Sequence, residues 1–193
     1  MKPIALVAAP FLAGALLAGC ASVPEPSASD VGEARAIAAK VPASLLAVLS
    51  DELQRGGPAG AIDACRVRAP EMARNASQQT GWNVRRASLR NRNPNGVPDA
   101  WERAALEQFD ARTAAGENPA TLERIQVVDE GGRRFLRYAK ALPTQGLCVQ
   151  CHGPEAALPP EVKSKLRALY PQDRAVGYTP GQVRGGLFLK KAL

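Results

Sequence analysis

The segment Cys148-Val-Gln-Cys151-His152 places two thiols and an imidazole within five residues, and His152 is the only histidine of the 193-residue chain. The spacing Cys-x-x-Cys-His is that of c-type haem attachment, in which two thiols add to the haem vinyl groups and the adjacent histidine binds iron. We therefore predict one covalently attached haem c, held through Cys148 and Cys151, with His152 as the proximal iron ligand. The chain must then fold around a macrocycle.

Other uses of this segment fit the sequence less well. A thioredoxin-like Cys-x-x-Cys pair normally lies in a strand-to-helix context, whereas this motif follows an expected strand and precedes a proline-rich segment. A zinc site needs about four ligands, and one histidine with one spare cysteine supplies too few.

The sixth position on the iron is not decided by the residues alone. With a single histidine, bis-histidine ligation within one chain is impossible. The candidates are Met72, Cys65, a lysine or a small molecule, and the position could also be open. Cys65 and Met72 lie on one stripe of an expected helix, where each could equally be a core residue.

The first nineteen residues have the pattern of a secretory signal: one cation, Lys2, then an apolar run and small residues. Their end, Leu17-Ala-Gly-Cys20, resembles a bacterial lipobox, in which the cysteine is lipidated and begins the mature protein. We expect a lipoprotein signal at 1–19, a tether at 20–30 and one haem domain at 31–193. Lipidated Cys20 would anchor the protein to a membrane of the bacterial periplasm, and Ala21 favours the outer membrane.

The formal net charge is +7, of which the leader contributes one through Lys2. Export and the scattered distribution of the cations argue against nucleic acid as a partner. We expect the cations to form a solvated surface, with a docking patch for an acidic protein or for haem carboxylates.

Hydrophobic spacing predicts two or more N-terminal helices followed by strands, an α+β chain with an antiparallel sheet. We expect a helix starting at a capping box formed by Asp30 and Glu33 and ending at Gly56-Gly57, then a second helix ending near Gly81. Pro70 should distort the turn just beyond Cys65. The remaining expected elements are a strand at 82–89, a helix at 99–113, a hairpin around 129–132, a helix at 160–169 and a final strand.

Several segments together resemble a family of single-haem extracytoplasmic domains with a PAS-like fold, which occur alone or as the sensor part of histidine kinases. The matching segments are AIDAC, RAPEMA, VRRASLRNRNPNGVPDAWE, FLRYAKAL, CVQCHG and YPQDRAVGYTPGQVRGGLF. They cover nearly everything from about residue 35 onward. Gln182 replaces the acidic residue typical of its position, which puts a local turn contact in doubt.

The resemblance implies a PAS-like α+β fold with N-terminal helices on a central antiparallel sheet. It also implies His152 and Cys65 as the two axial ligands, with Met72 as the alternative to Cys65. A thiolate ligand stabilises ferric iron and so lowers the reduction potential. One or two of Arg85, Arg86, Arg90 and Arg92 are candidates to pair with haem propionates.

These features predict a monohaem c-type cytochrome that transfers electrons or senses redox state for an unidentified redox or signalling protein. The alternative is a gas or small-ligand sensor in which Cys65 leaves the iron. A peroxidase is disfavoured, because two protein ligands would close the iron and no second histidine remains for acid–base chemistry. The sequence leaves the oligomeric state open.

Overall fold

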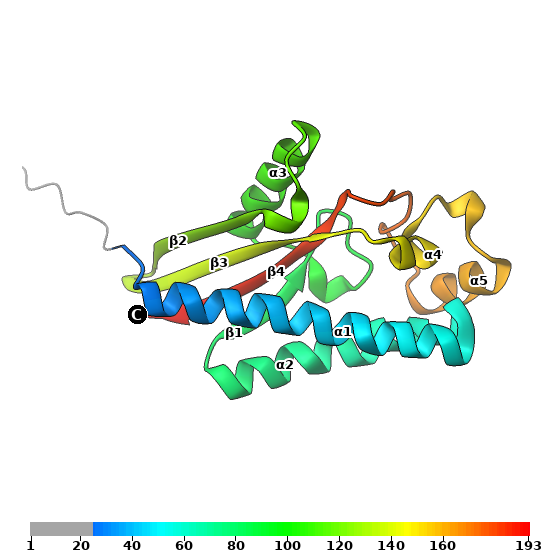
Figure 1. The fold of residues 1–193 in the computed structure, drawn as a ribbon, viewed down its shortest axis with the longest axis horizontal. Coiled ribbons are helices and arrows are strands. Elements are labelled where there is room, and N and C mark those ends of the chain that lie inside the picture. The colour runs from blue at the N-terminus through cyan, green and yellow to red at the C-terminus, as the bar shows by residue number, and fades with distance from the viewer. Residues whose placement is uncertain (1–24) are drawn as a thin grey trace, which may run out of the picture.

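The computed structural model describes residues 25–193, which form three layers: a pair of helices, a four-stranded sheet and a third helix (Figure 1). The helical elements are α1 (Ala28–Asp63), the π-helical turn η1 (Ala64–Arg68), α2 (Ala69–Thr80), α3 (Ala100–Ala114), α4 (Val149–His152) and α5 (Pro160–Leu169). The strands are β1 (Asn83–Ala87), β2 (Glu123–Glu130), β3 (Arg133–Pro143) and β4 (Val183–Ala192). The predicted α+β fold class is confirmed.

The sheet is antiparallel throughout, with the order β1-β4-β3-β2. The predicted hairpin is present, because β2 and β3 are joined at Gly131 and Gly132, both with positive φ. The final strand β4 inserts between β1 and β3, so the C-terminal segment completes the centre of the sheet.

The two faces of the sheet carry different helices. Leu136, Leu187 and Leu189 face the helices α1 and α2 and pack with Trp82. The alternate positions of the strands, such as Phe188, face α3 and pack with its buried side chains, because successive side chains of a strand point to opposite faces of the sheet. Burial on both faces fixes the register, since a slip of one residue would exchange the two sets.

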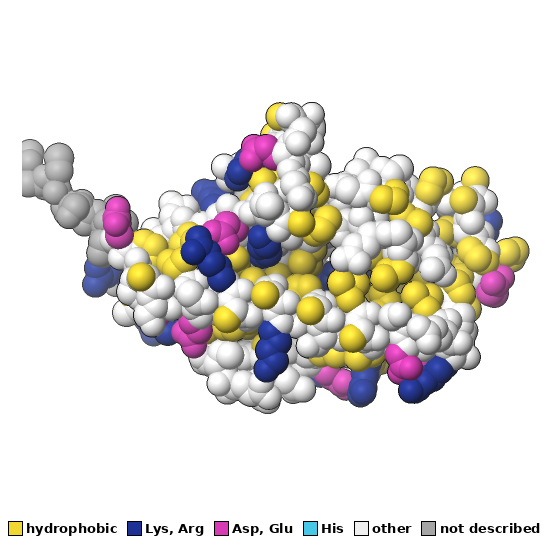
Figure 2. Space-filling view, viewed as in Figure 1, with side chains coloured by type: hydrophobic (Ala, Val, Ile, Leu, Met, Phe, Trp, Pro, Cys, Tyr) yellow, Lys and Arg dark blue, Asp and Glu magenta, His cyan; other side chains and the backbone are white. Residues whose placement is uncertain are grey.

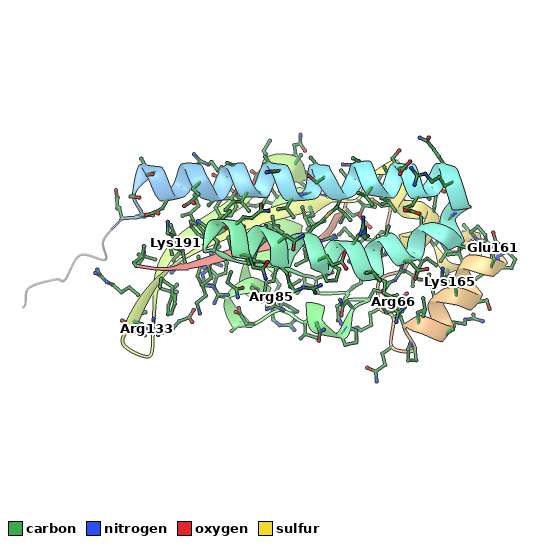
Figure 3. All side chains as sticks on the ribbon, turned by 90° about the horizontal axis from the view of Figure 1, so that it is seen from below. Arg66, Arg85, Arg133, Glu161, Lys165 and Lys191 are labelled. Carbon is green, nitrogen blue, oxygen red and sulfur yellow. The ribbon has the colours of Figure 1, made fainter. Side chains whose placement is uncertain are left out.

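The N-terminal helical segment reverses direction at Gly57, which has the non-helical angles φ 63° and ψ −173°. The first arm therefore ends where the glycine pair predicted, and the second arm runs from Pro58 through η1 and α2 to Thr80. Figure 3 shows the two arms side by side. Gly81, with φ 74°, caps the second arm, in agreement with the expected end.

The predicted capping box at the start of this segment is wrong. The helix begins at Ala28, and the N-cap is Ser27, whose hydroxyl accepts a hydrogen bond from the Asp30 amide. Asp30 and Glu33 instead bind the ammonium group of Lys191 on β4. The two carboxylates therefore tie the first arm to the sheet rather than cap a helix.

A third, smaller cluster of apolar contacts closes the end of the molecule opposite the hairpin. Ile62 from the second arm packs against Leu158, Val162 and Leu166 around α5, with Cys151 at the edge. This contact joins the N-terminal helices to the segment that carries the Cys-x-x-Cys-His motif.

No helix among residues 25–193 is long and apolar enough to cross a membrane. The predicted leader and lipidation site at Cys20 lie outside the described residues. Over the face seen in Figure 2, the charged side chains are dispersed rather than gathered into one patch.

Candidate functional site

A cavity of about 300 Å³ lies between the second arm, β1 and the motif segment. Its wall includes both Cys65 and His152, which are 87 positions apart in the sequence. Met72, the other predicted ligand, does not line it. The geometry therefore brings together the pair Cys65 and His152 and favours Cys65 over Met72.

Cys65 lies in the π-helical turn that Pro70 was predicted to distort. Proline has no N–H to donate, so the carbonyl of Arg66 loses its helical partner. The Ala69 amide then bonds the carbonyl of Ala64, five residues earlier, which is the π-helical pattern. Such bulges are frequent at functional sites, and this one places the thiol on the cavity wall.

Water reaches Cys65 through the open cavity, so the residue is exposed, yet protein atoms crowd the thiol on its other sides. This partial burial is the largest cause that raises the pKa of the Cys65 thiol. The positive charges of Arg86, Arg92 and Arg184 act in the opposite direction. A metal cation would favour the thiolate further, because coordinating thiols are deprotonated.

The imidazole of His152 is oriented by its backbone and by Ala175. Nδ1 lies 2.7 Å from the carbonyl oxygen of Ala175 and donates its proton there, so that Nε2 keeps a free lone pair. A carbonyl acceptor of this kind fixes the tautomer of a metal-binding histidine. Burial, and then the charges of Arg184 and Arg92, hold the pKa of His152 well below its usual value. The ring is thus kept neutral, as an iron ligand must be.

Backbone contacts hold the motif from three successive carbonyls. Arg92 donates to the carbonyl of Cys151 at 2.6 Å, the Tyr178 amide to that of His152 at 2.9 Å, and the Gly177 amide to that of Gly153 at 2.7 Å. The GY motif recognised in the sequence therefore positions the histidine. The Tyr178 ring also meets the imidazole edge-on at 6.4 Å.

The two thiols of the motif are not joined by a disulfide, and neither residue lines the cavity wall to which the adjacent His152 contributes. Burial raises the pKa of Cys151 to about 11, and its Sγ lies 3.8 Å from the carbonyl oxygen of Pro58. Charges on Cys65 and Cys148 would raise it further. Within residues 25–193, no three histidine, cysteine or carboxylate side chains are grouped as a metal-ion site.

The arginines near the loop at 88–97 are engaged in different ways. Arg85 binds the Glu102 carboxylate at 2.9 Å, Arg90 stacks 3.7 Å above the Tyr178 ring, and Arg92 binds Asp173 at 2.9 Å. Arg86 lines the cavity and has no carboxylate partner in the described part of the chain. Of the four candidates named from the sequence, Arg86 is therefore the one that lines the cavity without a carboxylate partner among residues 25–193.

Sequence reasoning assigned no role to Arg184, which also lines the cavity. Its guanidinium donates to Ser88 Oγ at 3.1 Å, and its Nε lies 3.2 Å from Nδ1 of His152. Burial lowers the pKa of Arg184 to about 10. The signal was present, because Arg184 is the arginine of the RG pair in the matching C-terminal segment.

Two glycines allow these groups to approach. A Cβ on Gly185 would lie 2.6 Å from the carbonyl oxygen of Ala87, so β1 and β4 can meet at the cavity only with glycine there. Gly181 has φ 88°, and the turn beside it is closed by Gln182, whose Oε1 accepts from the Thr179 amide at 3.0 Å. The side-chain amide of Gln182 thus supplies the turn contact that the sequence comparison had put in doubt.

The donor set fits a haem group on observations from this structure. A thiol and a neutral imidazole share one cavity, two more thiols lie in the segment that carries the imidazole, and the wall carries arginines in excess of carboxylates. A haem with two propionates would supply the iron and the negative charge that such a site lacks.

Comparison with known proteins agrees with the resemblance found in the sequence. Residues 25–191 match the family described as Tll0287-like: Tll0287. The chain belongs to this family. No match was found among curated proteins.

One solved structure, titled "Crystal structure of the cyanobacterial heme-protein Tll0287", is similar to this chain. The TM-score is 0.65 at 24% identity, and the match covers 86% of this chain and 96% of the other. At this identity the likeness shows the fold, which the two proteins share along nearly the whole described length.

Proposed function

We propose that the chain is a monohaem c-type protein of the bacterial cell envelope that exchanges single electrons with a partner protein, either in electron transfer or in redox sensing. Cys148 and Cys151 hold the haem covalently, and His152 and Cys65 bind its iron. Cys20 anchors the protein to a membrane of the periplasm through lipid.

The observation that carries this proposal is the cavity shared by Cys65 and His152, with the motif thiols in the segment that carries His152. Membership of the Tll0287-like family and the fold shared with a haem protein support it. The free lone pair of His152 Nε2 gives further support, since the Ala175 carbonyl takes the proton of the other ring nitrogen.

A haem supplies an iron that gains and loses one electron, and the residues of this chain set how readily it does so. The Cys65 thiolate donates negative charge, which favours the ferric state and gives a low potential. A reduced partner gives one electron, and an oxidised partner takes one electron back, so no group is transferred and no substrate is turned over. With both axial positions filled by the chain, we propose no enzymatic activity.

A second candidate is a gas or small-ligand sensor, and one observation favours it. Cys65 lies in a π-helical turn where Pro70 interrupts the regular helical hydrogen bonds, so fewer such bonds resist a backbone shift that would move its thiol off the iron. His152, by contrast, is fixed through three neighbouring carbonyls. Any ligand exchange would therefore take place on the Cys65 side.

The test is expression in a bacterium competent for cytochrome c maturation, followed by intact mass and optical spectra. We expect a mass increase of one haem that survives denaturation and is lost in Cys148→Ala/Cys151→Ala. A colourless protein without added mass would refute the proposal.

Cys65→Ala should remove the thiolate signature from the ferric spectrum, whereas the matched variant Met72→Leu should retain it. The opposite result would assign Met72 as the ligand. Spectra of the reduced protein with carbon monoxide separate the two functions: electron transfer predicts no change, and ligand sensing predicts replacement of Cys65.

A further inference from the structure

The cavity contains more positive charge than the chain itself neutralises. Arg86, Arg92 and Arg184 all line it, and of these only Arg92 has a carboxylate partner, Asp173. The three arginines are close enough that the charges of Arg86 and Arg92 lower the pKa of Arg184. Arg92 and Arg184 are half-buried, and cations withdrawn from water are costly unless an anion accompanies them.

Arg86 is the clearest case. It extends from β1 into the cavity, and none of the hydrogen bonds within residues 25–193 engages its guanidinium. Its side chain is exposed along the cavity, although the crowding of protein atoms around it is the main cause that lowers its pKa. All of its donors are therefore available to a bound group.

Arg184 has no acceptor in His152 when Nδ1 carries the proton, and iron on Nε2 fixes that tautomer. Nδ1 faces both the Ala175 oxygen at 2.7 Å and Arg184 Nε at 3.2 Å, and it cannot donate to one and accept from the other at once. Iron on Nε2 requires the proton on Nδ1, which then points to Ala175. The Nε–H of Arg184 then faces the Nδ1–H of His152, and two donors cannot form a hydrogen bond with each other. The guanidinium would form more hydrogen bonds if it turned to an anion.

We propose that Arg86 and Arg184 form a carboxylate-binding pair for a haem propionate, and that their charges raise the reduction potential set by the Cys65 and His152 ligands. This rests on the proposed function, because the carboxylate belongs to the haem. Guanidinium groups suit it, since they bind carboxylates through parallel hydrogen bonds. A free small anion has the same chemistry and is the competing occupant.

Arg86→Gln is the main test variant, because Arg86 has no hydrogen bonds to protein that the change would break. Arg184→Gln is the second, with Arg184→Lys to retain the charge if the fold needs it. Arg66→Gln is the matched control: Arg66 is exposed on the π-helical turn beside Cys65, outside the cavity wall (Figure 3).

The measurements are the reduction potential at mildly alkaline pH, where a carboxylate stays ionised, and the propionate bending band in the resonance Raman spectrum. We expect a more negative potential and a shifted band in Arg86→Gln and Arg184→Gln. Arg184→Lys should restore much of the potential, and Arg66→Gln should match the wild type in both. An unchanged potential and band in Arg86→Gln, with haem attached, would overturn the proposal.

Phosphate added to the wild type at constant ionic strength distinguishes the two occupants. A potential that does not depend on phosphate supports the propionate, and one that varies with phosphate assigns the pair to a free anion and overturns our proposal. Failure of the proposed function gives a different result, since the protein would then carry no haem.

Discussion

The molecule has two groups of arginines, one beside α3 and one along the cavity wall, and they differ in their counterions. Beside α3, Arg85 and Arg137 lie against Glu102, Asp99 and Glu130. The cavity wall carries Arg85 and four further arginines, Arg74, Arg86, Arg92 and Arg184, and of these four only Arg92 has a carboxylate partner among residues 25–193, Asp173. The first group resembles an ordinary structural network, whereas the second lacks negative charge. The comparison indicates that a ligand site is marked by arginines without carboxylate partners, and not by the number of arginines alone.

The largest effect is expected from Glu102→Ala. Glu102 is 1% exposed, binds Arg85 and accepts from the Asp99 amide in the capping box of α3. Its loss leaves Arg85 and Arg137 without their shared carboxylate and removes half of the cap. We expect unfolding free energy to fall by about 3–5 kcal/mol in urea denaturation. Glu107→Ala, on an exposed position of α3, is the control and should stay close to wild type.

Asp173→Ala tests the cavity group in the same way. It removes the carboxylate of Arg92, whose side chain is 9% exposed, and the acceptor of the Ala175 amide. We expect a loss of about 3 kcal/mol and a weaker hold on His152, because Ala175 accepts its Nδ1 proton. Asp51→Ala, which breaks the exposed pair with Arg55, should cost less than about 1 kcal/mol. Equal losses in the two variants would contradict the contrast between buried and exposed pairs.

Gly185→Ala addresses the strand contact that forms the cavity wall. The new methyl group would meet the Ala87 carbonyl at 2.6 Å, so β1 and β4 must separate. The expected cost is about 1–3 kcal/mol in thermal or urea unfolding. Gly60→Ala is the control, because Gly60 is helical with open space around it, and the change should be neutral or slightly stabilising.

The smallest effect concerns pH. Arg35, and then Tyr138, donate hydrogen bonds to Glu123 and hold its pKa below the usual value. A carboxyl with a lowered folded-state pKa stabilises the fold above its unfolded pKa, and this contribution is lost as pH falls through the lowered value. In Glu123→Gln, the free energy of unfolding should therefore fall less steeply as the pH is lowered below the unfolded-state pKa of a glutamate. Arg35→Gln should do the same, and additive losses in the double variant would exclude a direct interaction.

Local signals predicted much of the fold. The glycine pair at 56–57, Gly81 and the turn at 131–132 ended their elements as expected, and Pro70 correctly predicted the distorted turn. The capping box failed because Asp30 and Glu33 bind Lys191, 161 and 158 positions away, which no local pattern reports. The position of β4 between β1 and β3 was not predicted for the same reason, because it depends on contacts between residues far apart in the sequence.

The candidate site was predictable where chemistry is concentrated in a short segment. Cys148, Cys151 and His152 follow from one motif, and Cys65 from the family resemblance. The role of Arg184 did not follow, because its importance depends on which arginines already have carboxylates. Arg85 and Arg86 are adjacent in sequence and both line the cavity, yet Arg85 binds Glu102 and Arg86 has no carboxylate partner among residues 25–193. Only the pairing shown by the structure separates them.

The π-helical turn also sets the rotational phase of the second arm. Ile62, before the turn, packs toward α5, and Ala73, after it, packs onto the sheet. One residue corresponds to about 100° of rotation in an α-helix. Deleting one residue of the turn would restore a regular α-helix. The rotation would then expose to solvent either the side that carries Ile62 or the side that carries Ala73. The same turn therefore determines both the position of the Cys65 thiol and the packing of the second arm, and a change to one would change the other.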